Sequence, residues 1–288
     1  MRFVQVDVFS DGAYLGNPLA VFPEAGALST SQMQAIASEM NLSESSFVTS
    51  HSKDFYEVRI FTPTEEVDFA GHPTLGTAWV LRQQKFVDSD ELIQRSRAGD
   101  TRVRLEGDRV WFVRTGSSGP DEDDRLQDYS IWLARGLGLE DGDVGLEARE
   151  LGRAGHLRPA FADTGLRHLV VPLRNLEVLG AARPNLAALP DVRPGGFYCF
   201  TALQAGRMRA RGFMPGLGVD EDPATGSGVA DLGVYLADRV GPMEAEIVQG
   251  VEMGRLSRLL MRASAGKVSV GGACHHVFNG SLAELPPT

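Results

Sequence analysis

Residues 222–236 read DPATGSGVADLGVYL, and residues 68–81 read DFAGHPTLGTAWVL. Each stretch begins with an acidic residue, passes through a short spacer to a glycine and a polar residue, and then becomes apolar enough for an amphipathic helix. When Gly71–His72 is aligned with Gly226–Ser227, a leucine follows nine residues after the polar residue in both copies. Two short amphipathic helices could share this pattern by chance, but the part that they have in common is the unusual helix start and not the helix body. The pattern therefore predicts a duplicated half-site, with one copy in each half of the chain.

A helix start of this kind is suited to bind an anion. The first turn of a helix leaves several backbone N–H groups without partners and carries roughly half a unit of positive charge. A glycine at that point, such as Gly71 or Gly226, lets a carboxylate approach these N–H groups. As an alternative, Asp68 and Asp222 only cap their helices, each contributing about 0.3–1 kcal/mol, which would leave the pairing with Gly-Ser-Gly and Gly-His unexplained. If the two halves face each other, both helix starts converge on one cleft and hold a small carboxylate.

Composition and charge restrict the class of protein. The chain has 288 residues, 43% hydrophobic and 23% charged, which indicates a soluble globular protein of about two domains at ~150 residues each. The net charge of −10 argues against nucleic acid or a membrane surface as a partner, whereas a small anionic substrate fits a site with local positive potential. The start MRFVQVDVFS lacks the apolar core of a signal peptide, and no apolar run approaches the ~18 residues of a membrane span. With two cysteines outside any CxxC spacing, we expect a cytoplasmic protein.

The chain alternates short strands with a few helices. Residues 3–9 alternate apolar and polar as a strand does. A helix is expected over 29–40, with a capping box from Ser29 and Gln32 and an end at Asn41. The run TGSSGPDEDD, residues 115–124, has no apolar residue and is the best linker in the sequence. A second set of elements follows it. These patterns predict an α+β protein with two halves. Further strands are expected at 17–22, 46–50, 55–62, 102–106, 109–114, 167–173, 197–203, 207–213, 245–250, 256–264 and 267–272, and helices near 131–139 and after Gly226. The strands at 102–106 and 109–114 are expected to form a hairpin through Gly107 and Asp108.

Several motifs resemble those of one family. GNPLAVF at 16–22, NLSESSFV at 41–48, EDPATGS at 221–227 and QGVEMGRLSR at 249–258, together with the region around GHPTLG, resemble the PhzF (phenazine biosynthesis-like) isomerase family. The likeness runs over nearly the whole chain, in the expected order; Leu256 departs from it, where the family usually has proline. The resemblance implies a diaminopimelate-epimerase-like fold and a homodimer. Each of two similar domains would be a β-barrel-like sheet around a central helix, with the active site in the cleft between them. The domains are expected at 1–115, rejoined by 275–288, and at 116–274.

The two-thiol chemistry of this fold does not suit the sequence. The best-known members are racemases and epimerases with a cysteine immediately before the glycine of each helix start. The matching positions here are Ala70 and Thr225, and neither a methyl group nor a threonine hydroxyl is a base near pH 7. Cys199 and Cys274 lie outside both motifs and are expected to be buried structural residues. A two-thiol racemase is therefore excluded.

The resemblance points instead to Glu44, the glutamate of the NLSE motif, as the group that shuttles a proton. Glu44 follows a predicted helix end and is flanked by Leu42 and Phe47. Partial desolvation there would raise its pKa toward neutrality, as a group that both takes and gives a proton requires. From the residues alone, a solvated loop glutamate is the favoured alternative, and the resemblance reverses that preference.

The same resemblance assigns the other expected site residues. His72 and Asp222 should join Glu44 in the catalytic group, with Asp222 orienting an amine or hydroxyl and sharing a proton with His72. The backbone N–H groups of Gly71 and Gly226, with Ser227, should hold the carboxylate. Asn17 and Gln249 are further substrate-binding candidates, although both could only fix turns, and His72 could be a simple helix-start residue.

Other chemistries fit the sequence poorly. It contains no GxxxxGK[ST] and no strand-placed GxGxxG, and TGSGV is not the GxSxG nucleophile elbow. His275 and His276 would point to opposite faces of a strand, so one metal ion would not take both. We therefore expect no cofactor and no metal. The expected function is a cofactor-independent isomerase that transfers a proton on a small amino- or hydroxy-bearing carboxylic acid, in some cases cyclic. The namesake enzymes act on a dihydro-hydroxyanthranilate. The alternative is a non-catalytic small-carboxylate-binding protein of the same fold.

Overall fold

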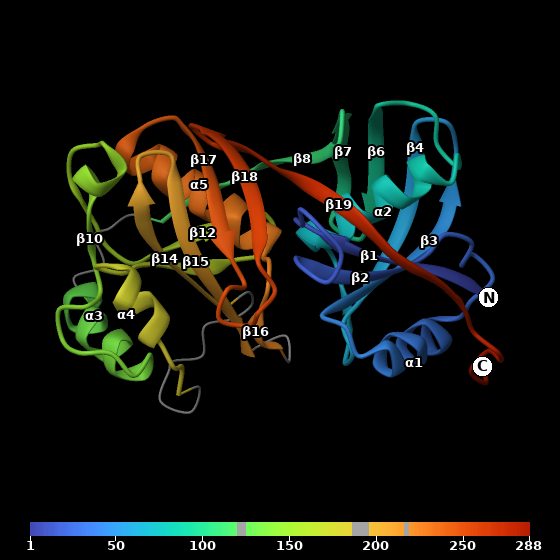
Figure 1. The fold of residues 1–288 in the computed structure, drawn as a ribbon, viewed down its shortest axis with the longest axis horizontal. Coiled ribbons are helices and arrows are strands. Elements are labelled where there is room, and N and C mark those ends of the chain that lie inside the picture. The colour runs from blue at the N-terminus through green and yellow to red at the C-terminus, as the bar shows by residue number, and fades with distance from the viewer. Residues whose placement is uncertain (120–124, 186–195, 216–218) are drawn as a thin grey trace. The chain divides into compact units, whose positions relative to one another are not determined.

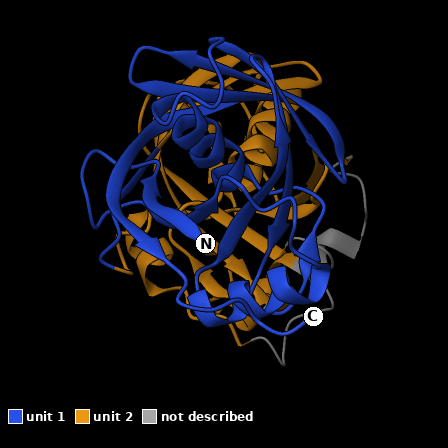
Figure 2. Cartoon of the chain, turned by 90° about the vertical axis from the view of Figure 1, so that its right-hand side faces the viewer, with its two compact units in different colours: residues 1–113, 254–258, 270–288 blue, residues 114–253, 259–269 orange. Residues whose placement is uncertain are grey.

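The computed structural model describes residues 1–119, 125–185, 196–215 and 219–288, and they form two compact units. Unit 1 consists of residues 1–113, 254–258 and 270–288, and unit 2 of residues 114–253 and 259–269 (Figure 2). The chain passes from unit 1 to unit 2 after residue 113, and the sequence placed this division after residue 115. The chain then returns to unit 1 twice, and no sequence pattern indicated the short return at 254–258.

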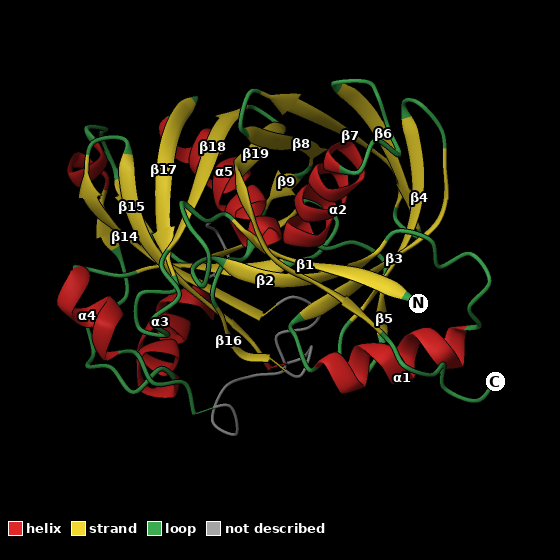
Figure 3. Ribbon diagram, turned by 45° about the vertical axis from the view of Figure 1, so that its right-hand side comes forward, coloured by secondary structure: helices red, strands yellow, loops and turns green. Residues whose placement is uncertain are grey.

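Unit 1 is a closed barrel of strands around one helix, α2. Going round the barrel, β1 pairs with β2, β2 with β3, β3 with β4, β4 with β6, β6 with β7, β7 with β8, β8 with β19, and β19 again with β1. Figure 3 shows α2 enclosed by these strands. The elements of this unit are β1 Arg2–Val8, β2 Asn17–Phe22, α1 Thr30–Met40, β3 Glu44–His51, β4 Phe55–Phe61, β5 Glu66–Val67, α2 Gly71–Gln83, β6 Glu91–Ser96, β7 Gly99–Glu106, β8 Arg109–Thr115 and β19 Lys267–Ser281.

Unit 2 repeats the strand pairing of unit 1 around its own helix, α5. In unit 1 the pairs β1–β2, β2–β3, β3–β4, β4–β5 and β4–β6 are antiparallel, parallel, antiparallel, antiparallel and parallel. The pairs β12–β13, β13–β14, β14–β15, β15–β16 and β15–β17 of unit 2 follow the same order. The elements are β9 Ser117–Ser118, α3 Arg125–Gly136, β10 Leu146–Glu147, η1 Ala148–Leu151, β11 His156–Leu157, β12 Ala160–Asp163, β13 His168–Pro172, α4 Leu176–Ala181, β14 Gly196–Gln204, β15 Arg207–Met214, β16 Val219–Asp222, α5 Gly226–Val240, β17 Met243–Gln249 and β18 Ser257–Ser264.

Two similar barrel-like units, each around a central helix, confirm the expected α+β fold class (Figure 1). The helices begin at Gly71 and Gly226, as the repeat predicts. The sequence suggested that α5 is amphipathic, but its residues from Gly226 to Ala237 are all buried, because strands surround the helix. The remaining helices pack on the outer face of each sheet. In unit 1, Phe22 and Phe47 stack at 4.8 Å within the apolar cluster that contains Met33 and Ile36 of α1.

Local sequence signals were reliable where a few neighbouring residues determine the structure. Ser29 and Gln32 form the capping box of α1, and Asn41 ends the helix in the left-handed conformation at φ 50°. Strands β7 and β8 form the expected hairpin. The expected linker is partly wrong, because β8 extends through Thr115 and Ser117–Ser118 pair with β12. Residues 120–124 of that run lie outside the described part of the chain.

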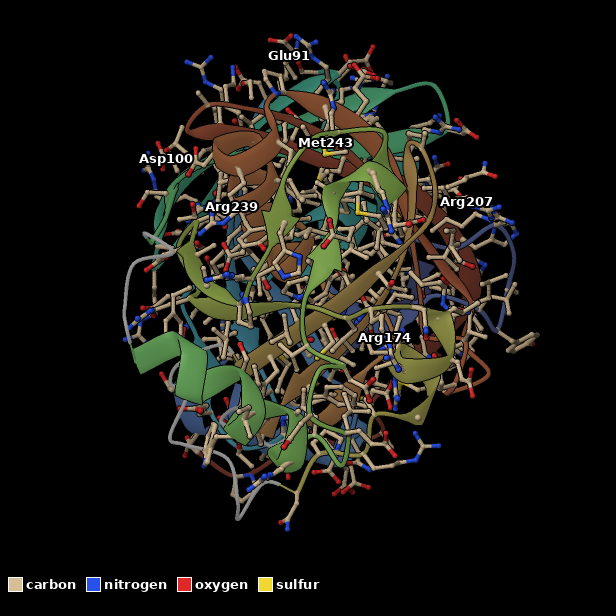
Figure 4. The ribbon with its side chains drawn as sticks, turned by 90° about the vertical axis from the view of Figure 1, so that its left-hand side faces the viewer. Glu91, Asp100, Arg174, Arg207, Arg239 and Met243 are labelled. Atoms are coloured by element: carbon tan, nitrogen blue, oxygen red, sulfur yellow. The ribbon has the colours of Figure 1, made fainter. Side chains whose placement is uncertain are left out.

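Charged side chains at the surface contribute little to this fold. Glu91, Asp100 and Arg207 lie toward the periphery in Figure 4, and they pair with Arg104, Arg95 and Glu246 at 2.6–2.9 Å. Exposed pairs of this kind are worth about 0–1 kcal/mol. Within the described ranges, no helix has the length and apolar character needed to cross a membrane. The cytoplasmic location and the homodimer stay predictions.

We predict that Gly228→Val destabilises the protein through overpacking inside the second barrel. A Cβ on Gly228 would come within 2.4 Å of the Tyr198 ring, whose hydroxyl donates a hydrogen bond to Gln249. The unfolding free energy should fall by about 1–3 kcal/mol or more, as overpacked cores show, measured by urea denaturation. Gly12→Val is the control, because nothing lies within 4 Å of a Cβ at that position. Equal effects in both variants would contradict the prediction.

Candidate active site

In unit 1, the start of helix α2 is not capped by a side chain. The N-cap residue is Ala70, which makes no side-chain capping bond. Asp68 does not take this role: its side chain is 62% exposed and pairs with Arg97 at 3.2 Å. The interpretation of Asp68 as a helix cap is therefore wrong. Nor does Asp68 correspond to Asp222, because the spacer is one residue longer in the second copy and Asp222 aligns with Val67 when counted back from the two glycines.

Two of the expected catalytic residues meet at this helix start. His72 lies in the first turn of α2, and Glu44 is the first residue of β3, where it pairs with Leu19 of β2. Glu44 thus lies in a strand, whereas the residues alone favoured a loop position. His72 Nδ1 lies 3.4 Å from Glu44 Oε2, and the two side chains are 3% and 14% exposed. A carboxyl group and an imidazole are thus held together in a largely buried position.

Burial fixes the charge of His72. It lowers the pKa of His72 from its ordinary value of 6.5 to about 3, while a hydrogen bond to the backbone of Pro18 acts in the opposite direction. The imidazole is therefore neutral at pH 7, with one N–H donor and one nitrogen lone pair. Pro18 follows Asn17, the buried first residue of β2. Unit 1 thus brings Glu44 and His72 together and places Asn17 next to a residue that contacts His72.

In unit 2, the start of α5 rests on a buried hydrogen-bond network. The Thr225 hydroxyl donates to Asp222 Oδ2 at 2.8 Å, and Asp222 is 7% exposed. The Gln249 amide nitrogen donates to the Asp222 carbonyl and to Thr225 Oγ1, at 2.7 and 2.9 Å. Its amide oxygen accepts from the Tyr198 hydroxyl and the Thr225 N–H, at 3.0 and 3.2 Å. Gln249 thus contacts both Asp222 and the residue that precedes α5, and its expected contact with the substrate stays a prediction.

The network in unit 2 also includes a residue that the sequence did not reveal. Tyr198 lies within the apolar strand β14, and nothing in that pattern distinguishes it from a core residue. Burial, with a smaller effect from the negative charge of Asp222, raises its pKa well above the ordinary value. Gly226 and Ser227 begin α5, and both are buried. The expected proton sharing between His72 and Asp222 joins residues of different units and stays a prediction.

The two cysteines are buried, as expected. Burial raises the pKa of Cys199 to about 12 and also raises the pKa of Cys274. Both thiols are thus protonated near neutral pH and are poor nucleophiles. Cys199 belongs to an apolar cluster with Phe197 and Phe213. Among the described residues, no three His, Cys, Asp or Glu side chains are grouped so that they could hold a metal ion.

Comparisons with known proteins agree with this architecture. Residues 6–280 match the family of phenazine biosynthesis-like proteins. The trans-2,3-dihydro-3-hydroxyanthranilate isomerase of Pseudomonas aeruginosa is 37% identical over 284 residues, covering 94% of this chain and 96% of that protein. A PhzF-family protein of Bacillus anthracis has a crystal structure that superposes with a TM-score of 0.83 at 23% identity, covering 99% of both chains. A hydroxyproline epimerase from Agrobacterium vitis shares the fold, with a TM-score of 0.60 at 12% identity over 97% of this chain and 91% of that one.

Fold and sequence together define the class as an isomerase built on the fold of the amino-acid epimerases. The chain belongs to the phenazine biosynthesis-like protein family.

We predict that His72 makes the stability of the protein depend on pH. The folded pKa of about 3 lies below the ordinary value of 6.5, so below pH 6.5 the unfolded chain binds a proton that the folded chain excludes. The stabilisation is complete above pH 6.5 and is lost as pH falls toward 3. Between pH 7 and pH 5 the loss should be about 2 kcal/mol. His72→Gln should remove this slope in urea denaturation, and parallel pH profiles of parent and variant would disprove it.

Proposed function

We propose that this isomerase works without a cofactor, moving a proton on a small carboxylic acid that bears an amino or hydroxyl group, with Glu44 as the general acid and base. One observation carries the proposal: Glu44 Oε2 lies 3.4 Å from His72 Nδ1 at a helix start that no side chain caps. A carboxylate can take a proton and return it to another atom, and the neutral imidazole beside it adds no positive charge that would hold the carboxylate ionised.

For the substrate, we propose trans-2,3-dihydro-3-hydroxyanthranilate or a closely related cyclic amino acid. The name of the Pseudomonas aeruginosa relative supports this class. Its carboxylate would bind the backbone N–H groups of Gly71 and Gly226 together with Ser227, because helix starts favour anions. The buried carboxyl of Asp222 would bind the amine or hydroxyl, and Asn17 would add a further polar contact.

The proposed reaction leaves the composition of the substrate unchanged. Glu44 removes a proton from a ring carbon, and the electrons of that C–H bond enter the conjugated system. The protonated Glu44 then delivers the proton to another carbon of the same system. No electrons are gained or lost, so a single carboxyl group suffices. N–H groups at the helix starts would stabilise the negative charge that develops between the two transfers.

A protein that binds a small carboxylate without turnover is the remaining alternative. It would keep the helix starts and the network around Gln249 but would exchange no proton with its ligand. Incubation with trans-2,3-dihydro-3-hydroxyanthranilate in D₂O separates the two functions. Deuterium in the product supports the isomerase, whereas binding without exchange supports the alternative.

We predict that Glu44→Gln abolishes most of the activity and keeps binding. The amide retains the shape of the side chain but cannot titrate, so the isomerisation rate should fall by about 10²–10⁴. Affinity for 3-hydroxyanthranilate, a stable aromatic counterpart of the proposed substrate, should change little in calorimetry. Glu57→Gln on the neighbouring strand β4 is the control. Isomerisation at the parental rate in Glu44→Gln would assign the proton transfer to another group.

A further inference from the structure

The short return of the chain to unit 1, residues 254–258, lies against the loop of residues 9–16 that joins β1 to Asn17. Backbone hydrogen bonds fix this contact at two points: the Gly16 N–H donates to the Leu256 carbonyl at 3.0 Å, and the Arg258 N–H donates to the Phe9 carbonyl at 2.8 Å. This segment joins β17 to β18, which lie largely in unit 2.

Arg255 of this segment binds both strand β1 and the loop. Its Nη2 donates to Asp7 Oδ1 at 2.6 Å and to the Leu15 carbonyl at 2.9 Å, and its Nε donates to the Gly16 carbonyl at 3.0 Å. The other carboxylate oxygen of Asp7 accepts the Tyr14 N–H at 2.6 Å. Asp7 is only 1% exposed. One guanidinium and one buried carboxylate thus bind three consecutive residues of the loop.

The loop needs such support because its backbone is strained. Tyr14 has a φ of 68°, in the left-handed region that a tyrosine rarely adopts, and its side chain is 72% exposed, so packing does not hold it there. Gly16 has a φ of 65°, and a Cβ there would lie 2.3 Å from the Val8 carbonyl. Glycine adopts this conformation without strain, so the hydrogen bonds to Asp7 and Arg255 oppose a local preference of the chain at Tyr14.

The strained loop ends at the candidate site. Asn17 follows Gly16 directly and is completely buried at the start of β2. The next residue, Pro18, contacts His72 through its backbone, and His72 Nδ1 lies 3.4 Å from Glu44 Oε2. We infer that Arg255, paired with Asp7, is a positioning residue that sets the orientation of Asn17 and the adjoining Pro18 carbonyl. Its effect on turnover rests on the proposed function; its effect on Asn17 does not.

The first test measures the position of Asn17 without a substrate. The chain has five asparagines, Asn17, Asn41, Asn175, Asn185 and Asn279, so ¹⁵N-asparagine labelling gives five side-chain amide pairs in NMR spectra, and Asn17→Gln identifies one of them. Arg255→Lys keeps a cation beside buried Asp7, whereas alanine would leave that carboxylate without its ion-pair partner. The Asn17 amide signal should shift or broaden in Arg255→Lys while the signals of Asn41, Asn175 and Asn185 stay in place. An unchanged Asn17 signal would overturn the inference.

Arg258→Lys is the matched control. Arg258 belongs to the same segment and pairs with Asp11 of the same loop at 2.5 Å, but that carboxylate is 61% exposed. The Asn17 signal should keep its position in this variant. A shift as large as that in Arg255→Lys would show that any change in the segment moves Asn17, which would overturn the specific role of Arg255.

The second test measures turnover of trans-2,3-dihydro-3-hydroxyanthranilate. Misplaced binding groups can reduce rates by up to about 100-fold, so kcat/KM should fall about 10- to 100-fold in Arg255→Lys, mainly through KM. If Arg255 acts through Asn17, the double variant Asn17→Ala/Arg255→Lys should be no worse than Asn17→Ala. If the two substitutions instead lower kcat/KM independently, so that their effects multiply in the double variant, Arg255 does not act through Asn17. If the parent protein shows no turnover, the proposed function fails on this substrate, while the amide signal of Asn17 still decides the positioning role.

Discussion

Each unit of this protein encloses a helix within a sheet, and that constraint governs the site. A helix buried on all sides leaves its first backbone N–H groups without partners from its own helical ladder. In α2 and α5 the N-cap residues are Ala70 and Thr225, and neither caps its helix with a side chain. The two helix starts thus offer donors and partial positive charge inside a protein of net charge −10. Donors of this kind suit the small anion that we propose as the substrate, without a cluster of basic residues.

The same burial decides which side chains can carry protons. It holds His72 neutral and keeps the Cys199 thiol protonated at pH 7. Neither a thiolate base nor an imidazolium acid is therefore present at these positions. Glu44 differs because it opens a strand at the margin of the buried region and its side chain is 14% exposed. A carboxyl group with some access to a ligand, next to a neutral imidazole, suits reversible proton transfer better than a deeply buried acid.

Sequence reasoning succeeded where the signal was local. The capping box of Ser29, the left-handed Asn41 and the glycine that begins each central helix follow from preferences of a few neighbouring residues. It failed where distant strands decide the outcome. The role of Gln249 depends on Tyr198, more than fifty residues earlier in the chain and identifiable only once β14 and β17 are folded. The return of residues 254–258 to unit 1 rests on Asp7 at the other end of the sequence, a pairing that no periodicity encodes.

The two units repeat one topology but differ in their side-chain chemistry. In unit 2 the residue before the helix glycine is Thr225, whose hydroxyl donates to Asp222 and accepts from Gln249. In unit 1 that position is Ala70, which offers no hydroxyl, and the position matching Asp222 is Val67. Without that network, the helix start in unit 1 accommodates the contact between His72 and Glu44. A hydrogen bond from Thr225 holds the Asp222 carboxylate in place, whereas Glu44 lies beside a neutral imidazole. The same topology thus carries a hydrogen-bonded helix start in unit 2 and a carboxyl–imidazole contact in unit 1, a difference that fits our proposal that Glu44 moves the proton.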